Sequence, residues 1–228
     1  MPVNSQFFVR LIFLISPLLQ AKVYSPQVTA GSQTGIAFSI PYSAGTHNGF
    51  ARSFDGLIET DESDQLVSAQ FMVPIESLTT SNKTRDCHML EALGLDYNAS
   101  SFPEQHVCNS QNQLPRTGPN SIVYPNLAFQ FQSFNQFPTV PLQVGVPTKA
   151  RVKAVLQIHG VTRQLNSLPI TVTKTIVRGQ ALLRVQSQFQ LSLQNYQIIV
   201  KPVRIGPFSF GVDDTLSVSL DLILKEQN

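Results

Sequence analysis

Two cysteines and two histidines form the densest group of reactive side chains in the sequence. Cys87-His88 and His106-Val107-Cys108 supply two thiols and two imidazoles, which is the donor composition of a zinc site. Their spacing is not that of a usual zinc motif, because adjacent residues project from a helix about 100° apart and rarely reach one ion. Three states therefore stay open: a disulfide between Cys87 and Cys108, which we favour for an exported protein, a metal site, and two free thiols.

His159 is the other candidate for chemistry, as a general base. No Ser or Cys nucleophile motif accompanies it, and the sequence holds no GxSxG, no CxxC and no Gly-rich phosphate loop. We therefore expect no catalytic residues, and expect His159 to be a strand-end histidine that hydrogen-bonds the neighbouring turn. His47, which precedes the turn signal Asn48-Gly49, is expected to be a turn residue.

The segments that would position these residues mostly have a period of two. The clearest alternations of apolar and polar residues lie in 152–158, 183–193 and 216–224, and such alternation is typical of strands with one buried face. Several short strands with turn signals between them indicate a sandwich or a barrel, and a closed barrel leaves no exposed edge. One segment differs: residues 84–95 contain Met, Leu and Ala and predict a single short helix ending near Gly94.

The amino-terminal segment predicts export. Arg10 precedes a nine-residue apolar run, Leu11–Leu19, which is too short to span a bilayer, and Ala21 is a suitable small residue for cleavage. These features predict a secretory signal peptide over residues 1–21. No later segment is long and apolar enough to cross a membrane, so we expect a periplasmic or secreted protein without a stable membrane anchor.

The charge content argues against one class of partner. Charged residues make up 13% of the chain and the net charge is +2, whereas nucleic-acid binding normally needs clustered Lys and Arg. The polar surface is built from Gln, Asn, Ser and Thr instead. We expect no nucleic-acid partner, and the sequence leaves the oligomeric state open.

Two sequence blocks carry a family resemblance. The first is TSNKTRDCHMLEALG (residues 80–94), followed by Phe102-Pro103, and the second is the strand that ends in IHGVTR (residues 158–163). In this order they resemble the YceI-like family of bacterial lipid-binding proteins, and residues 216–222 are similar to the closing strand of that family. The two cysteines and the long polar stretch at 109–126 depart from the commonest pattern and leave the ligand's identity open.

The resemblance implies an all-β fold: one domain over residues 35–226, an eight-stranded antiparallel lipocalin-like barrel with one short helix. It further implies a long apolar ligand of polyisoprenoid type inside the barrel, bound without catalysis and without a cofactor or metal. A barrel of this size is either filled by side chains or holds one slender ligand, and alternation alone does not distinguish these cases. The expected lipid-binding residues lie on the inward faces of different strands: Phe71, Val73, Phe129, Phe131, Ala154, Leu156, Val185 and Phe189.

Two other functions stay open at this point. One is a metal-binding protein or enzyme that uses the cluster Cys87, His88, His106 and Cys108. The other is a structural or stress-related protein with a filled barrel. Arg85 and Asp86 are similar to an Arg-Asp pair of the family. They are expected to pair their charges at the helix start, with a headgroup contact by Arg85 as the alternative.

Overall fold

The computed structural model describes residues 21–27, 35–136, 141–205 and 208–227. The predicted signal peptide lies outside the described residues, except for Ala21. The barrel strands are β1 (Lys22–Pro26), β4 (Asp55–Thr60), β5 (Leu66–Pro74), β7 (Asn126–Gln136), β8 (Thr148–Ile158), β9 (Val161–Val177), β10 (Gln180–Ser192) and β13 (Thr215–Glu226). The other elements are β2 (Ile36–Tyr42), β3 (Gly45–Ala51), β6 (Leu78–Thr79), β11 (Val203–Ile205), β12 (Phe208–Phe210), α1 (Lys83–Gly94) and the 3-10 turns η1 (Ile75–Ser77) and η2 (Gln194–Tyr196).

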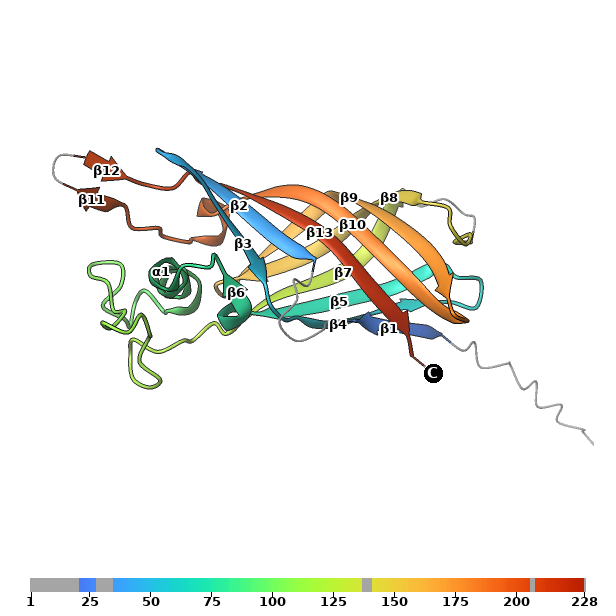
Figure 1. Cartoon of the computed structure of the whole chain (residues 1–228), viewed down its shortest axis with the longest axis horizontal. Helices are drawn as coiled ribbons and strands as arrows, with labels where there is room; N and C mark the ends of the chain where they lie inside the picture. The colour runs from blue at the N-terminus through green and yellow to red at the C-terminus, as the bar shows by residue number, and fades with distance from the viewer. Residues whose placement is uncertain (1–20, 28–34, 137–140, 206–207, 228) are drawn as a thin grey trace, which may run out of the picture.

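The eight barrel strands form a closed ring. Each pairs antiparallel with its neighbours in the order β1-β4-β5-β7-β8-β9-β10-β13, and β13 pairs back onto β1. The predicted eight-stranded antiparallel barrel is therefore confirmed. Figure 1 shows α1 at one end of this barrel, with the β11–β12 hairpin projecting at the same end. We call this end the helix end, and the opposite end the far end.

Three further strands, β2, β3 and β6, extend the wall towards the helix end. β2 pairs with the first half of β13 and β1 pairs with its last residues, so both lie along the same neighbour. β3 pairs with β2 on one side and with β6 on the other. The predicted domain range of 35–226 leaves out β1, although β1 pairs with both β4 and β13.

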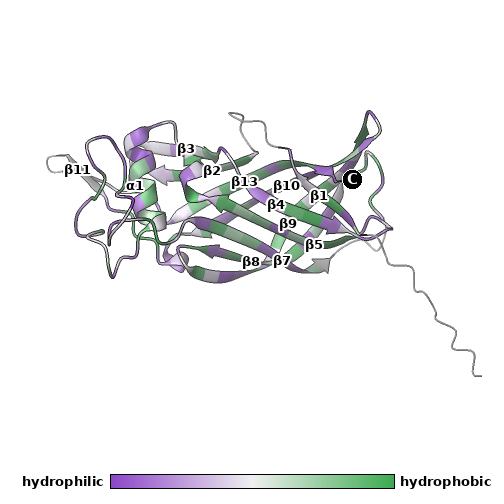
Figure 2. Cartoon of the chain, turned by 90° about the horizontal axis from the view of Figure 1, so that it is seen from below, coloured by the Kyte–Doolittle hydropathy of each residue, from purple (hydrophilic) through white to green (hydrophobic). Residues whose placement is uncertain are grey.

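Strand β8 shows why the sequence folds into a wall with an apolar inside. Its residues 150, 152, 154, 156 and 158 are buried, whereas Arg151, Lys153 and Gln157 between them are exposed. Successive strand side chains point to opposite faces, so the apolar set covers the interior. Figure 2 shows the same alternation of hydropathy along several strands of the wall.

Helix α1 begins and ends close to the predicted bounds. Asn82 is its N-cap, and the Asn82 side chain accepts a hydrogen bond of 3.0 Å from the backbone N–H of Arg85, as N-cap residues do. The helix ends at Gly94, and the following residue, Leu95, is fully buried. Within the described residues, no helix combines the length and apolarity needed to cross a bilayer.

The far end is fastened by one carboxylate. Asp64, in the connection between β4 and β5, accepts hydrogen bonds from Lys22 Nζ at 2.7 Å and from Lys174 Nζ at 2.6 Å. These two lysines belong to β1 and β9, so Asp64 joins three parts of the wall. Burial opposes its ionisation, but the hydrogen bonds from Lys174 and Lys22 outweigh this effect and hold the pKa of Asp64 below its usual value.

Replacing Asp64 by Asn should therefore destabilise the barrel. Loss of the charge weakens both hydrogen bonds and leaves two half-buried lysines without their counterion, which should cost about 1–2 kcal/mol at pH 7. Because the folded-state pKa of Asp64 is depressed, its contribution is present above about pH 4 and is lost as the pH falls through the folded pKa.

Urea unfolding of Asp64→Asn at pH 7 and at pH 3 measures both effects, with the exposed Glu104→Gln as the charge control. The difference between Asp64→Asn and the parent should shrink at the lower pH. Equal unfolding midpoints at pH 7 would contradict the role of Asp64.

Candidate functional site

An apolar cavity of about 310 Å³ lies inside the barrel. This volume is at the lower end of the range for small-molecule sites. Its wall is almost entirely aliphatic and aromatic, and it includes side chains from both ends of the barrel. Ile58, Val172 and Leu222 contribute from the far-end half, and Met89 and Leu93 contribute from α1. The interior is therefore not filled by the side chains that face it.

The structure brings together seven of the eight residues expected to bind lipid. Those that line the cavity are Phe71, Val73, Phe129, Phe131, Leu156, Val185 and Phe189. The eighth, Ala154, is fully buried on the same inward face of β8, between Val152 and Leu156, but does not itself line the cavity. The positions follow from the period of two. Their role in binding stays a prediction.

Helix α1 supplies a part of the wall that sequence reasoning did not assign. Its lining residues recur at the i, i+3, i+4, i+7 and i+8 spacing of one helical face: Arg85, His88, Met89, Ala92 and Leu93. This spacing is the usual signature of a helix with one side against a core. It was present in the sequence, but only the fold shows that this side covers the end of a cavity.

The few polar lining residues gather mainly at the helix end, namely His47, Thr80, Arg85 and His88. The imidazole of His47 stacks on Tyr42 with ring centroids 3.9 Å apart. Burial lowers the pKa of His47, and the charge of Arg85 lowers it further. The Thr80 hydroxyl is already engaged, because it donates to the Asp86 carboxylate at 2.6 Å.

Asp86 is bound to the strand that precedes the helix. Its carboxylate also accepts hydrogen bonds from the Thr79 hydroxyl at 2.7 Å and from the Thr80 backbone N–H at 2.6 Å. The expected charge pairing of Arg85 with Asp86 is not among the ion pairs of the described residues. Asp86 therefore anchors the helix start to β6. The Arg85 side chain lines the cavity instead of pairing with Asp86.

The two cysteines form a disulfide, as predicted. Cys87 of α1 is bonded to Cys108 with a Cα–Cα distance of 6.2 Å. The bond ties the helix to the loop that follows Phe102-Pro103. Because both sulfurs are in the disulfide, neither is a thiolate that could bind a metal ion. The cluster of Cys87, His88, His106 and Cys108 therefore does not offer the donor set of a Cys2His2 site.

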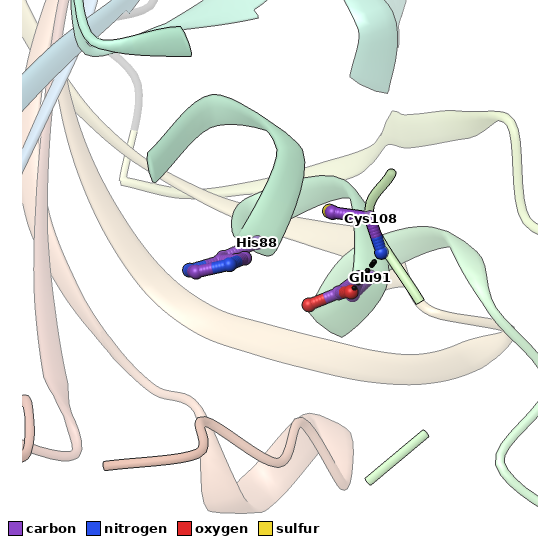
Figure 3. A group of neighbouring side chains, drawn as sticks. All are labelled: His88, Glu91 and Cys108. Carbon is purple, nitrogen blue, oxygen red and sulfur yellow. Dashed lines mark hydrogen bonds between the residues drawn. The ribbon is translucent and has the colours of Figure 1, made fainter. Parts of the chain in front are cut away.

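A buried carboxylate lies beside the disulfide. Glu91 is fully buried, and its Oε1 accepts hydrogen bonds from the backbone N–H groups of Val107 at 2.6 Å and Cys108 at 2.9 Å. Its Oε2 lies 2.6 Å from His106 Nδ1. Figure 3 shows Glu91 joined to Cys108 in this way, with His88 nearby on the same helix. Both carboxylate oxygens are thus engaged, and the arrangement serves to hold the 106–108 segment on α1.

The imidazole of His88 completes this group of residues. It stacks on His106 with ring centroids 4.1 Å apart. Burial lowers the pKa of His88, and the neighbouring His106 lowers it further. His88, Glu91 and Cys108 have potential ligand atoms within 4.8 Å of one another, but the sulfur is in the disulfide and the carboxylate is already hydrogen-bonded. The geometry therefore favours a structural cluster over a metal centre.

His159 also has a structural position, with a different partner from the one expected. It occupies the β8–β9 turn with a φ of 51°, followed by Gly160 with a φ of 72°. Its Nε2 donates a 2.8 Å hydrogen bond to the carbonyl of Leu95, at the C-cap of α1, and not to the neighbouring turn. The ring packs against Tyr97 and Tyr124. The hairpin thus fixes the end of the helix over the barrel.

Comparisons with known proteins agree with this architecture. A family model for the YceI-like domain matches residues 28–224. A YceI protein of Campylobacter jejuni superposes with a TM-score of 0.54 at 14% identity, covering 79% of this chain and 85% of that one. A polyisoprenoid binding domain from Saccharophagus degradans, implicated in plant cell wall breakdown, gives a TM-score of 0.54 at 12% identity, covering 92% and 99%.

BcnA of Burkholderia cenocepacia has a TM-score of 0.50 at 12% identity, covering 89% of this chain and 95% of that one. A search of curated proteins found no match. At these identities the solved structures show a shared fold, and the function has to be argued from the site.

Replacing Glu91 by Gln tests the structural role of the buried carboxylate. The amide keeps the size of the side chain but places an NH2 group where a carboxylate oxygen now accepts a hydrogen bond, so the free energy of unfolding should fall by about 1–3 kcal/mol. The matched control is Glu76→Gln, because Glu76 is exposed in η1 and should change stability by less than about 0.5 kcal/mol. Urea unfolding with the disulfide intact measures both; equal losses in the two variants would be incompatible with this role.

Proposed function

The chain belongs to the YceI-like family, and from that premise we propose that it binds one long apolar ligand of isoprenoid type inside its barrel. Binding occurs without chemical change to the ligand, in the periplasm or outside the cell after export. The observation that carries the proposal is the apolar cavity of about 310 Å³ inside the barrel. A filled barrel with a purely structural role does not fit this open interior.

The chemistry of the wall supports an apolar chain as the occupant. Each CH2 group that moves from water into such a wall contributes about 0.8 kcal/mol before the cost of ordering the ligand. A chain of many such groups is therefore held without a polar contact along its length. The Saccharophagus degradans domain, which is named for polyisoprenoid binding, supports the isoprenoid class.

The lining favours binding over catalysis. The hydroxyl groups of both the threonine and the serine in the lining are already engaged: Thr80 donates to Asp86, and Ser187 donates to the Pro169 carbonyl at 2.6 Å. Neither is paired with a histidine that would activate it as a nucleophile. Among the described residues, no Asp or Glu lines the cavity, so the wall offers no carboxylate base.

The disulfide supports the proposed location. Disulfides persist in oxidising compartments such as the periplasm and the extracellular space. The Cys87–Cys108 bond closes a loop that holds the helix against the cavity. Export to an oxidising compartment would therefore also keep this end of the cavity in place.

Ala154→Phe tests the cavity as the binding site. A phenyl ring at this inward position of β8 has to project between Val152 and Leu156, both of which line the cavity. It should weaken the binding of a fluorescent prenyl probe about tenfold, equivalent to losing the burial of roughly two CH2 groups. Gln157→Phe adds the same ring to the outer face of the same strand and should bind as the parent does.

Delipidated protein titrated with the probe gives the measurement, and circular dichroism checks that the variants keep the barrel. The proposal fails if the parent shows no saturable uptake, or if Ala154→Phe folds and binds as tightly as Gln157→Phe.

A further inference from the structure

One residue of the cavity wall has a chemistry unlike the rest. Arg85 is the only lining residue that carries a permanent charge, within the part of the chain that the structure describes. It is half-buried, on the face of α1 that covers the barrel. An apolar chain alone has no use for a guanidinium group at this position.

The Arg85 side chain has no protein partner among the described residues that accounts for its charge. It forms none of the four ion pairs. The carboxylate next to it in sequence, Asp86, is held by Thr79 and Thr80. A partly desolvated cation without a counterion is costly, and an anion supplied by a ligand removes that cost.

Two imidazoles lie on the same part of the wall. His47 and His88 both line the helix end of the cavity, and each neutral imidazole carries one N–H that can donate a hydrogen bond. Arg85 is near enough to His47 for its charge to lower the pKa of that imidazole. The three side chains therefore offer one cation, the Arg85 guanidinium, and two imidazoles that can donate hydrogen bonds. None of the three is a carboxylate that would repel an anion.

The helix end is also where the cavity meets the surface. His47, Thr80 and Arg85 are half-buried, and the lining residue Val200 is 39% exposed. In contrast, the far-end lining residues Ile58, Val172 and Leu222 are at most 2% exposed. An amphipathic ligand that enters chain first thus leaves its head beside Arg85.

We propose that the ligand carries an oxyanion head, a phosphate or a carboxylate, which Arg85 binds at the helix end of the cavity with hydrogen bonds from His47 or His88. The inference rests on the proposed function, because it concerns the head of the same ligand. Arginine suits this role since its planar fork of N–H groups matches both carboxylate and phosphate oxygens. A neutral alcohol of the same chain length gains only one ordinary hydrogen bond.

Three ligands with one chain and different heads test the proposal: farnesol, farnesoic acid and farnesyl phosphate. Their affinities for the delipidated protein are measured by calorimetry in low-salt buffer at neutral pH. At least one acid should bind about tenfold or more tightly than farnesol, as charge-assisted hydrogen bonds are about twice as strong as neutral ones. The acid with the larger preference identifies the oxyanion.

The matched variants are Arg85→Gln and Lys83→Gln. Lys83 is exposed on the first turn of the same helix and does not line the cavity, so its removal takes away an equal charge nearby. The ratio of acid affinity to farnesol affinity should collapse towards one in Arg85→Gln and stay at the parent value in Lys83→Gln.

The outcomes separate this proposal from the proposed function. If farnesol binds saturably but neither acid binds more tightly to the parent, the anionic head is wrong and the apolar binding stands. A preference lost equally in both variants also overturns the role of Arg85, since it then reflects general charge. If none of the three ligands binds, both proposals fail. The parent comparison does not depend on either variant folding.

Discussion

The closure of eight strands into one ring is the constraint on which the rest of the structure depends. Each of the eight ring strands has partners on both sides, because β13 returns to β1. Alternation then directs one apolar row of each strand inward. A ring of eight strands is just wide enough to leave space for a slender ligand, and here the inward rows leave a cavity of about 310 Å³.

The helix end holds α1 over that cavity, and most of the polar lining residues lie there. Four contacts fix the helix: Asp86 to β6, the Cys87–Cys108 bond, Glu91 to the backbone of the 106–108 segment, and the His159 ring to the carbonyl of Leu95. Within the described residues, Arg85 is the only charged residue of α1 that lines the cavity. Among the described residues, the far end contributes no charged side chain to the lining, and Lys22 and Lys174 there both pair with Asp64.

Much of the fold was predictable because it depends on local periodicity. The inward rows of β8 and β10 and the bounds of α1 follow from patterns within single segments. The roles of Glu91 and His159 did not follow, because their partners are distant in the chain: the loop at 106–108 and, for His159, a carbonyl 64 positions away. The open interior was equally beyond the sequence, since a filled barrel and a hollow one share the same alternation.

The central claim is that this barrel holds one apolar ligand, and native mass spectrometry of protein purified without detergent tests it most directly. Mild ionisation should show a species heavier than the protein alone by the mass of one lipid, and solvent extraction should release a compound with an isoprenoid chain. A spectrum that contains only the bare chain, before and after incubation with extracted membrane lipids, would contradict the account.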